Sequence, residues 1–266
     1  MSIRVCWPLN MVKVVLWLLL VCSTQAYAEI CSILREDASV RVSYVYDADT
    51  VRLDNGERVR VLGIDAPELA RDDQPDEPFS VEGRDFLREL LAEHDNRVLL
   101  HYGSDTHDQY GRRLAWLFLP DGSNVQRLLL EQGLVMQVFV SPNLDYADCL
   151  MLHEQGARLA RRGIWSQTEY HPGIDSVMVP ESTRGAAIVK GEVVRVGESR
   201  DNIWINLEGG VALQIRRDNM GVFADLNLEK LKGKLLRARG WLVKEERPHH
   251  QWRMRLDDRR SLEFLN

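Results

Sequence analysis

The sequence predicts a mainly β protein with added helices (an α+β fold), built from two small β-barrels in series. Three observations support this. Of the 266 residues, 45% are hydrophobic, enough for compact cores over more than one domain of ordinary length. Short segments with apolar residues at every second position recur in both halves of the chain. Segments with helical spacing lie between those strands in the first half.

Four segments of the first half are rich in β-branched and aromatic residues that alternate with polar ones, a pattern typical of half-buried strands. These segments are residues 40–53, 57–64, 97–102 and 114–119. DNG at 54–56 and PDG at 120–122 are turn sequences at two of their ends. We expect these strands to form a small antiparallel barrel.

Three helices are expected between and after these strands. They span residues 80–93, 124–132 and 145–162. Ser80 is predicted to cap the first, while Gly133 and Gly163 follow the other two, in the position where glycine commonly ends a helix. Residues 69–79, with four acids and two prolines, are predicted to form a loop.

The second half begins after an aperiodic segment, residues 169–182, which we interpret as a linker. Five further strands are predicted at residues 186–196, 202–207, 211–216, 234–243 and 252–257. A helix is expected at 219–230. Five strands and a helix in about eighty residues fit an OB-like barrel, and a small SH3-like barrel is the alternative.

The first 28 residues have the pattern of a secretory signal peptide. Lys13 precedes an apolar run at 14–21, and small residues at Ala26 and Ala28 follow it. The run is shorter than the roughly 20 residues of a membrane-spanning helix, so we expect no stable membrane insertion after cleavage. Met11 is an alternative start. The expected organisation is a signal peptide at 1–28, a first domain at 29–168, a linker at 169–182 and a second domain at 183–266, in a secreted or periplasmic protein.

Cleavage after Ala28 would leave two cysteines, Cys31 and Cys149, in a compartment that permits disulfides. A bridge between them would close a long loop, for which loop entropy predicts roughly 4 to 5 kcal/mol of stabilisation. The alternative is a pair of buried free thiols. Titration of thiols in the denatured protein, with and without reductant, distinguishes the two.

Charge is distributed unevenly. Residues 29–182 carry 15 Lys and Arg against 28 Asp and Glu, a net charge of −13, whereas residues 183–266 carry 17 against 12, a net +5. The first part by itself would repel a polyanion at long range. A nucleic acid would therefore have to be held by local arginines or by the second domain.

Three short motifs contain the residues that could form a catalytic site: YDADTV (46–51), RVLGIDAPE (60–68) and DQYGRRLAW (108–116). Asp47, Asp49 and Asp65 offer the hard oxygen ligands that Ca²⁺ or Mg²⁺ prefers. Acids at strand ends are also commonly solvated or capping residues, so the first motif alone does not establish a metal site.

Arg60 and Arg112 are the cationic complement of these acids. A guanidinium matches phosphate oxygens with a planar fork of donors and stays charged. A phosphodiester attacked by water gains negative charge on its equatorial oxygens, so two arginines and a cation would stabilise the transition state. Glu68, held relative to Asp65 by Pro67, could orient or deprotonate the water. The alternatives are an arginine paired with an acid at the edge of the core and a simple YGR turn.

Taken in order, these motifs, with LLEQGLV and a helix ending in GIW, resemble the staphylococcal nuclease (thermonuclease) family over about residues 40–166. The resemblance implies an OB-like five-stranded barrel with three helices for the first domain. It also implies a Ca²⁺-dependent phosphodiesterase that acts on DNA and RNA and leaves 3′-phosphates, with Mg²⁺ as an alternative ion. By position, Arg60, Glu68 and Arg112 match the family's catalytic residues, and Asp49 and Asp65 match its metal-binding carboxylates.

Other positions match the family in part. Ala66 falls where the family offers a backbone carbonyl to the metal, and Tyr110 matches a tyrosine near the nucleotide phosphate. Phe139 stands where we align a base-stacking tyrosine, and its ring could still stack. Gln109 replaces a basic residue, and the loop at 70–79 is acidic where the family's is rich in lysine. These departures affect substrate affinity more than chemistry.

The second domain has a net positive charge and three tryptophans, Trp204, Trp241 and Trp252, that could stack on unpaired bases. The alternative is that they are core residues and that the domain docks on the nuclease or on a partner. The predicted function is an endonuclease or endo-exonuclease, with single strands as the preferred substrate. The rival predictions are an inactive module that binds nucleic acid or protein, and a phosphodiesterase of small nucleotides. Oligomeric state is not predicted.

Overall fold

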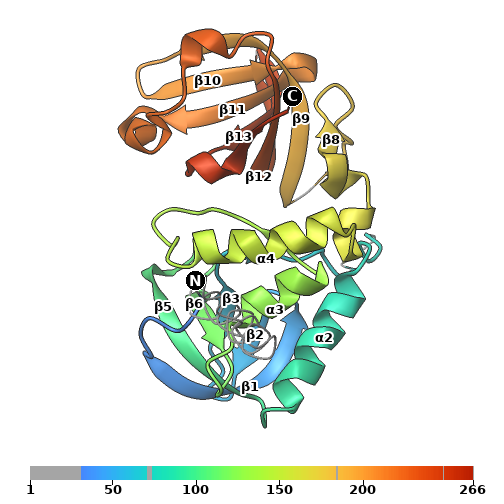
Figure 1. Ribbon diagram of the computed structural model, residues 1–266, viewed down its shortest axis with the longest axis vertical. Coiled ribbons are helices and arrows are strands. Elements are labelled where there is room, and N and C mark those ends of the chain that lie inside the picture. The colour runs from blue at the N-terminus through green and yellow to red at the C-terminus, as the bar shows by residue number, and fades with distance from the viewer. Residues whose placement is uncertain (1–30, 71–73, 184, 248, 266) are drawn as a thin grey trace, which may run out of the picture.

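The computed structural model describes residues 31–70, 74–183, 185–247 and 249–265. The predicted signal peptide, residues 1–28, lies outside them. Two β-barrels are stacked along the long axis of the molecule, with helix α4 between them (Figure 1). The mixed fold class is confirmed. Among the described residues, we find no helix of the length and apolar character needed to cross a membrane.

Five strands in the order β1-β2-β3-β6-β5 close the first barrel. Their bounds are β1 Ala38–Asp47, β2 Thr50–Leu53, β3 Arg58–Val61, β5 Arg97–His107 and β6 Arg113–Phe118. β3 and β6 run parallel and the other neighbours antiparallel, so the barrel is not purely antiparallel as predicted. The segment at 40–53 is two strands rather than one, because the Asp47 carboxylate accepts the Asp49 N–H and stabilises a turn there.

The chain leaves the first barrel through a corner at Gly63. Gly63 has φ +75°, and a Cβ at this position would lie 2.5 Å from the buried ring of Trp116. Only glycine fits both the conformation and the space. The chain then enters β4, Ile64–Asp65, which pairs outside the barrel with β7, Met136–Gln137. The corner thus brings the sequence around Asp65 back over the barrel.

Three helices accompany this barrel: α2 Ser80–Ala92, α3 Val125–Gln132 and α4 Ala147–Leu159. α3 agrees closely with prediction. The Asn124 side chain accepts a hydrogen bond from the Arg127 N–H (2.8 Å), and Gly133 ends the helix in the left-handed conformation.

The ends of the other two helices differ from prediction. Ser80 is the first residue of α2 rather than its cap, and its buried hydroxyl has no hydrogen-bond partner. Phe79, the residue before α2, has φ 72°. Its side chain makes no capping hydrogen bond to the helix. α4 ends at Leu159, before the predicted 162, because Arg161 adopts φ 53°, which a helix cannot accommodate.

The second barrel has the same strand order as the first. β9 Ala186–Glu198, β10 Asn202–Leu207, β11 Val211–Arg216, β13 His250–Arg255 and β12 Leu235–Arg247 follow one another, and β12 pairs with β9 to close the ring. β11 and β13 run parallel, as β3 and β6 do. This shared order supports the OB-like interpretation over the SH3-like one.

Two segments of this half differ from prediction. The helix expected at 219–230 is instead two short 3₁₀ turns, Arg217–Phe223 and Leu228–Lys230, because Asn227 is extended between them. The segment expected as a linker contains a strand, β8 Ile174–Asp175, which pairs with β9. A final strand, β14 Leu262–Phe264, pairs with β12.

A buried network of ion pairs joins the barrels. Arg239 on β12 reaches Glu154 on α4 at 2.7 Å, with exposed side-chain fractions of only 5% and 1%. The same glutamate accepts the Gln137 N–H (2.7 Å), so its charge is compensated from both sides. Glu263 on β14 binds Arg158 and Arg237. Burial alone would raise the pKa of Glu263, but hydrogen bonds from these arginines lower it to about 2. The second domain is therefore attached by specific, charged contacts.

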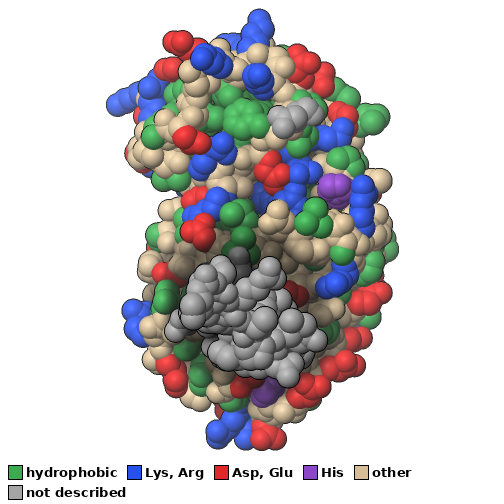
Figure 2. All heavy atoms as spheres, in the orientation of Figure 1, with side chains coloured by type: hydrophobic (Ala, Val, Ile, Leu, Met, Phe, Trp, Pro, Cys, Tyr) green, Lys and Arg blue, Asp and Glu red, His purple; other side chains and the backbone are tan. Residues whose placement is uncertain are grey.

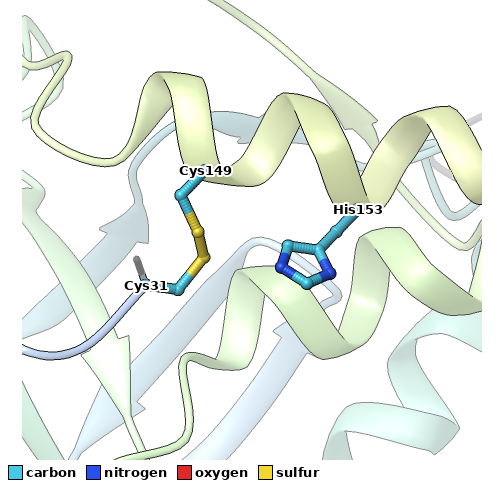
Figure 3. Close-up of side chains that lie close together, drawn as sticks. All are labelled: Cys31, Cys149 and His153. Atoms are coloured by element: carbon cyan, nitrogen blue, oxygen red, sulfur yellow. A yellow bond between two sulfur atoms is a disulfide. The ribbon is translucent and has the colours of Figure 1, made fainter. Parts of the chain in front are cut away.

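The predicted disulfide between Cys31 and Cys149 is present in the structure, with Cα atoms 5.7 Å apart. It ties the segment before β1 to α4 (Figure 3). Cys31, Cys149 and His153 are close enough to resemble a metal-binding group. Because both sulfurs are used in the bridge, the group does not provide thiolate ligands.

We expect Arg239→Met to lower the free energy of unfolding by about 3 to 5 kcal/mol, because it removes the nearer of the two cations from the buried Glu154 and leaves Arg158 at 4.0 Å. Urea denaturation of the full chain measures this. Arg35→Met removes an exposed pair with Asp37 and serves as the control, with no measurable change expected. Equal effects in the two variants would contradict the importance assigned to the buried pair.

Candidate active site

The turn between β1 and β2 orients Asp49. The Asp47 carboxylate accepts the Asp49 N–H (3.0 Å), and the Thr50 hydroxyl donates to Asp49 Oδ1 (2.8 Å). Asp49 Oδ2 accepts the N–H of Ala66 (2.8 Å), which follows β4. The side chains of Asp47, Asp49 and Thr50 are all buried. Two segments distant in sequence are thus joined at one carboxylate.

Arg60 is at the centre of the site. Its Nη1 donates to the carbonyls of Val61 (2.7 Å) and Ile64 (2.8 Å), at the corner where β3 ends. Its Nη2 lies 2.7 Å from Asp65 Oδ1 and 3.2 Å from Asp49 Oδ2. Burial would lower the pKa of Arg60, but the carboxylates of Asp49 and Asp65 outweigh this and raise it. These contacts hold the Arg60 guanidinium against both carboxylates.

The corner after β4 carries Glu68 at the surface. Its backbone N–H donates to Glu77 Oε2 (2.9 Å), and the Glu77 N–H donates to the Glu68 carbonyl (2.9 Å). These bonds hold the backbone of Glu68 in place. The Glu68 carboxylate is near enough to contribute to the pKa shifts of Arg60 and Asp65. It therefore belongs to the same electrostatic cluster.

Arg112 reaches the cluster from the loop between β5 and β6. Its Nε donates to Asp108 Oδ2 (2.6 Å), and its Nη1 lies 3.4 Å from the Thr50 hydroxyl. Asp108 Oδ1 also accepts the N–H groups of Tyr110 and Arg112 (both 2.9 Å), which shapes the turn. Sequence reasoning missed the roles of Asp108 and Thr50. The signals were an aspartate two residues before YGR, typical of an Asx turn, and a threonine directly after Asp49.

The acids of this cluster are crowded. Burial, and then the Asp49 carboxylate, raise the pKa of Asp47 to about 7. Burial raises the pKa of Asp65 to about 7, with Arg60 opposing and Asp49 adding to the shift. Carboxylates that repel one another in a buried site are a suitable environment for a cation. With the Ala66 carbonyl, Asp49 and Asp65 form the kind of oxygen donor set that fits Ca²⁺ or Mg²⁺.

A cleft of about 680 Å³ opens beside the cluster. Arg60, Arg112 and Tyr110 line it, and Tyr110 is 74% exposed there. The second domain lines it as well, through Trp241 and Arg255. The cleft is thus formed by both barrels, which no motif in the sequence indicated.

Phe139, predicted to stack on a base, does not line this cleft. It is 6% exposed, with the guanidinium groups of Arg239 and Arg260 within 6 Å of its ring centre. The second domain covers the face that a base would need. Of the three tryptophans, Trp252 is a core residue at 3% exposure, in agreement with the core alternative, while Trp241 is 40% exposed.

Comparisons with known proteins identify relatives of the first domain. The profile of staphylococcal nuclease homologues matches residues 58–167, which contain Arg60, Asp65, Glu68 and Arg112. A thermonuclease of Staphylococcus intermedius is 32% identical over 133 residues, 48% of this chain and 77% of the relative. An uncharacterized endonuclease of Escherichia coli O157:H7 is 30% identical over 143 residues, 53% of this chain and 85% of the relative.

A thermonuclease of Staphylococcus hyicus is 29% identical over 133 residues, 49% of this chain and 77% of the relative. These relatives thus match about half of the chain and most of their own length. With the closed five-stranded barrel and the arginine–carboxylate cluster at one end of it, they establish that the chain belongs to the staphylococcal nuclease family.

Proposed function

We propose that the protein is a nuclease that hydrolyses phosphodiester bonds of DNA or RNA with the help of a divalent cation. One observation carries the proposal: Arg60, Asp49 and Asp65 are in direct contact beside a cleft that Arg112 also lines. Metal-assisted hydrolysis of a phosphodiester requires cationic hydrogen-bond donors and oxygen ligands for a metal ion around the same phosphate. The names of the relatives, thermonuclease and endonuclease, support the same chemistry.

In this proposal the two arginines bind the phosphate and stabilise the negative charge that develops on it. Arg60 is held by two backbone carbonyls and Arg112 by Asp108, so neither must be ordered during the reaction. Glu68, exposed on its rigid corner, takes the proton of the attacking water. Tyr110 at the mouth of the cleft contacts the substrate.

Asp49, Asp65 and the Ala66 carbonyl are the proposed holders of the cation, Ca²⁺ with Mg²⁺ as the alternative. Bound there, it would supply a Lewis acid beside the phosphate and neutralise the crowded carboxylates. We also propose a secreted or periplasmic location, supported by the apolar segment after Lys13 and by the disulfide. Cell fractionation with N-terminal sequencing tests the location, and a cytosolic protein that retains residues 1–28 would contradict it.

Cleavage of single-stranded DNA and RNA by the purified protein tests the activity itself. No cleavage of either nucleic acid, with Ca²⁺ or Mg²⁺, would favour the alternative of an inactive binding module. Cleavage of dinucleotides without cleavage of long strands would favour a phosphodiesterase of small nucleotides.

Glu68→Gln is expected to lower kcat by about 10² to 10⁴-fold, the usual contribution of a general base. Because the side chain is exposed, thermal unfolding should stay unchanged. The control is Glu82→Gln, an exposed acid on α2, which should retain full turnover. Wild-type turnover in Glu68→Gln would remove this residue from the mechanism.

Arg112→Lys is expected to lower kcat/KM by about 10²-fold or more, because an ammonium cannot reproduce the planar, two-pronged contact of the guanidinium. Arg113→Lys is the matched control. Its side chain turns to Glu57 (2.9 Å) instead of the cleft, so the same chemical change should have little effect. Steady-state kinetics on one oligonucleotide compares the two, and equal losses would argue against a phosphate contact by Arg112.

Chelation of divalent cations is expected to abolish cleavage, and added Ca²⁺ to restore it. Ca²⁺ should also raise the Tm of the wild type, since it binds the folded protein. In Asp49→Asn this rise in Tm should be much smaller. Undiminished activity in excess chelator would contradict the cation site.

A further inference from the structure

The outer face of the second barrel carries a groove of about 910 Å³ that the proposed catalytic site does not include. Its floor is formed by β10, β11 and β13. Its walls include the β9–β10 loop around Arg200 and the β12–β13 loop around His249. In OB-type barrels this face, between the corresponding loops, is where oligonucleotides bind. The groove therefore has the location that a nucleic-acid site on this barrel would have.

The charge of the groove is suited to a phosphate chain. Six arginines line it against three carboxylates: Arg200, Arg216, Arg217, Arg247, Arg253 and Arg255, against Asp201, Asp218 and Glu245. In Figure 2, side chains of both charges are scattered over the upper domain, whereas Asp and Glu are more frequent along the lower right edge of the other domain. The net charges of +5 and −13 for the two parts of the chain follow the same division.

The arginines are paired, but the pairs are weak ones. Arg216 binds Asp218 and Arg217 binds Glu198, and the side chains of these arginines are 52% and 44% exposed. Exposed ion pairs contribute little, so a phosphate can take the place of the carboxylate at small cost. Each guanidinium also has further donors to offer.

Aromatic rings line both the groove and the cleft. Trp204 stacks on His250 within the groove, with ring centres 5.4 Å apart and planes at 26°. Trp241 is 40% exposed in the catalytic cleft. Stacking on protein rings requires unpaired bases, because the faces of bases in a duplex are already covered. This favours a single strand over a double helix.

The groove and the catalytic cleft have one lining residue in common. Arg255 lines both. The relative position of the barrels is maintained by the Arg239–Glu154 pair and by the N–H of Ala186, which lies 3.4 Å from Asp65 Oδ2. A chain that extends from the groove past Arg255 would meet Trp241, Arg60 and Arg112, which line the cleft.

We propose that the second domain binds single-stranded nucleic acid in this groove and delivers it to the catalytic cleft, so that the substrate is a strand of several nucleotides. The inference rests on the proposed nuclease function. The main observation behind it is a groove lined by arginines and aromatic rings. One of these arginines, Arg255, also lines the cleft.

Binding is measured with the inactive Glu68→Gln full chain and a fluorescent oligothymidylate of about 20 nucleotides, longer than the roughly 4 to 16 that one OB barrel occupies. Adding Arg216→Gln and Arg217→Gln should weaken binding about tenfold. The slope of log K against log salt should fall by about 1.4, since each lost phosphate contact on a single strand contributes about 0.7. The control is Lys234→Gln, an exposed cation of the same domain outside the groove, which should change neither quantity.

Kinetics separates this inference from the proposed function. In the active chain, the ratio of kcat/KM for the long strand to that for a dinucleotide should be high, and Arg255→Gln should reduce it about tenfold. An unchanged ratio, together with unchanged affinity and salt slope in the groove variants, would overturn the inference even if the enzyme cuts both substrates. The groove would then suit another acidic partner, such as a protein. Absence of cleavage of either substrate would instead contradict the nuclease proposal and leave the binding assay to decide the groove.

Discussion

The contact of Arg60 with Asp49 and Asp65 is the interaction on which the rest of the site depends. It joins the β1–β2 turn, the end of β3 and the start of β4 at one guanidinium. A buried arginine must be paired and hydrogen-bonded, and here two carbonyls and two carboxylates do so. Burial, with the Asp49 carboxylate adding to it, raises the pKa of Asp47 and of Asp65 to about 7. The same burial that orders the cluster therefore favours a cation beside it.

The two barrels share a strand order but use it differently. The first places its polar cluster at the β1–β2 turn and the β5–β6 loop, and the second has an arginine-lined groove between the corresponding loops, β9–β10 and β12–β13. α4 lies between the barrels and contributes Glu154 and Arg158 to their interface. Because these contacts are charged and directional, they specify one relative orientation, which lets both domains line one cleft.

Much of the first domain could be predicted from the sequence. α3 was predicted correctly because its signals are local: an asparagine that caps its first N–H groups and a glycine that can adopt φ 66°. The predicted role of Ser80 as the N-cap of α2 was wrong, because the helix begins one residue earlier than expected and Ser80 lies inside it, in the core. The helix at 219–230 was wrong because Asn227 interrupts a pattern that looked continuous. The stacking role predicted for Phe139 was wrong, because Arg239 and Arg260 of the second domain lie against its ring.

By itself, the sequence determined the strand periodicity and the residue types of the site, because these follow from local conformation and from the chemistry that phosphate and cations need. It also indicated which two cysteines could pair. Only the tertiary structure decided that Trp241 lines the cleft and that Arg255 lines both the cleft and the groove. Those facts depend on how two barrels pack, through contacts such as Arg239 with Glu154 that are 85 residues apart in the chain.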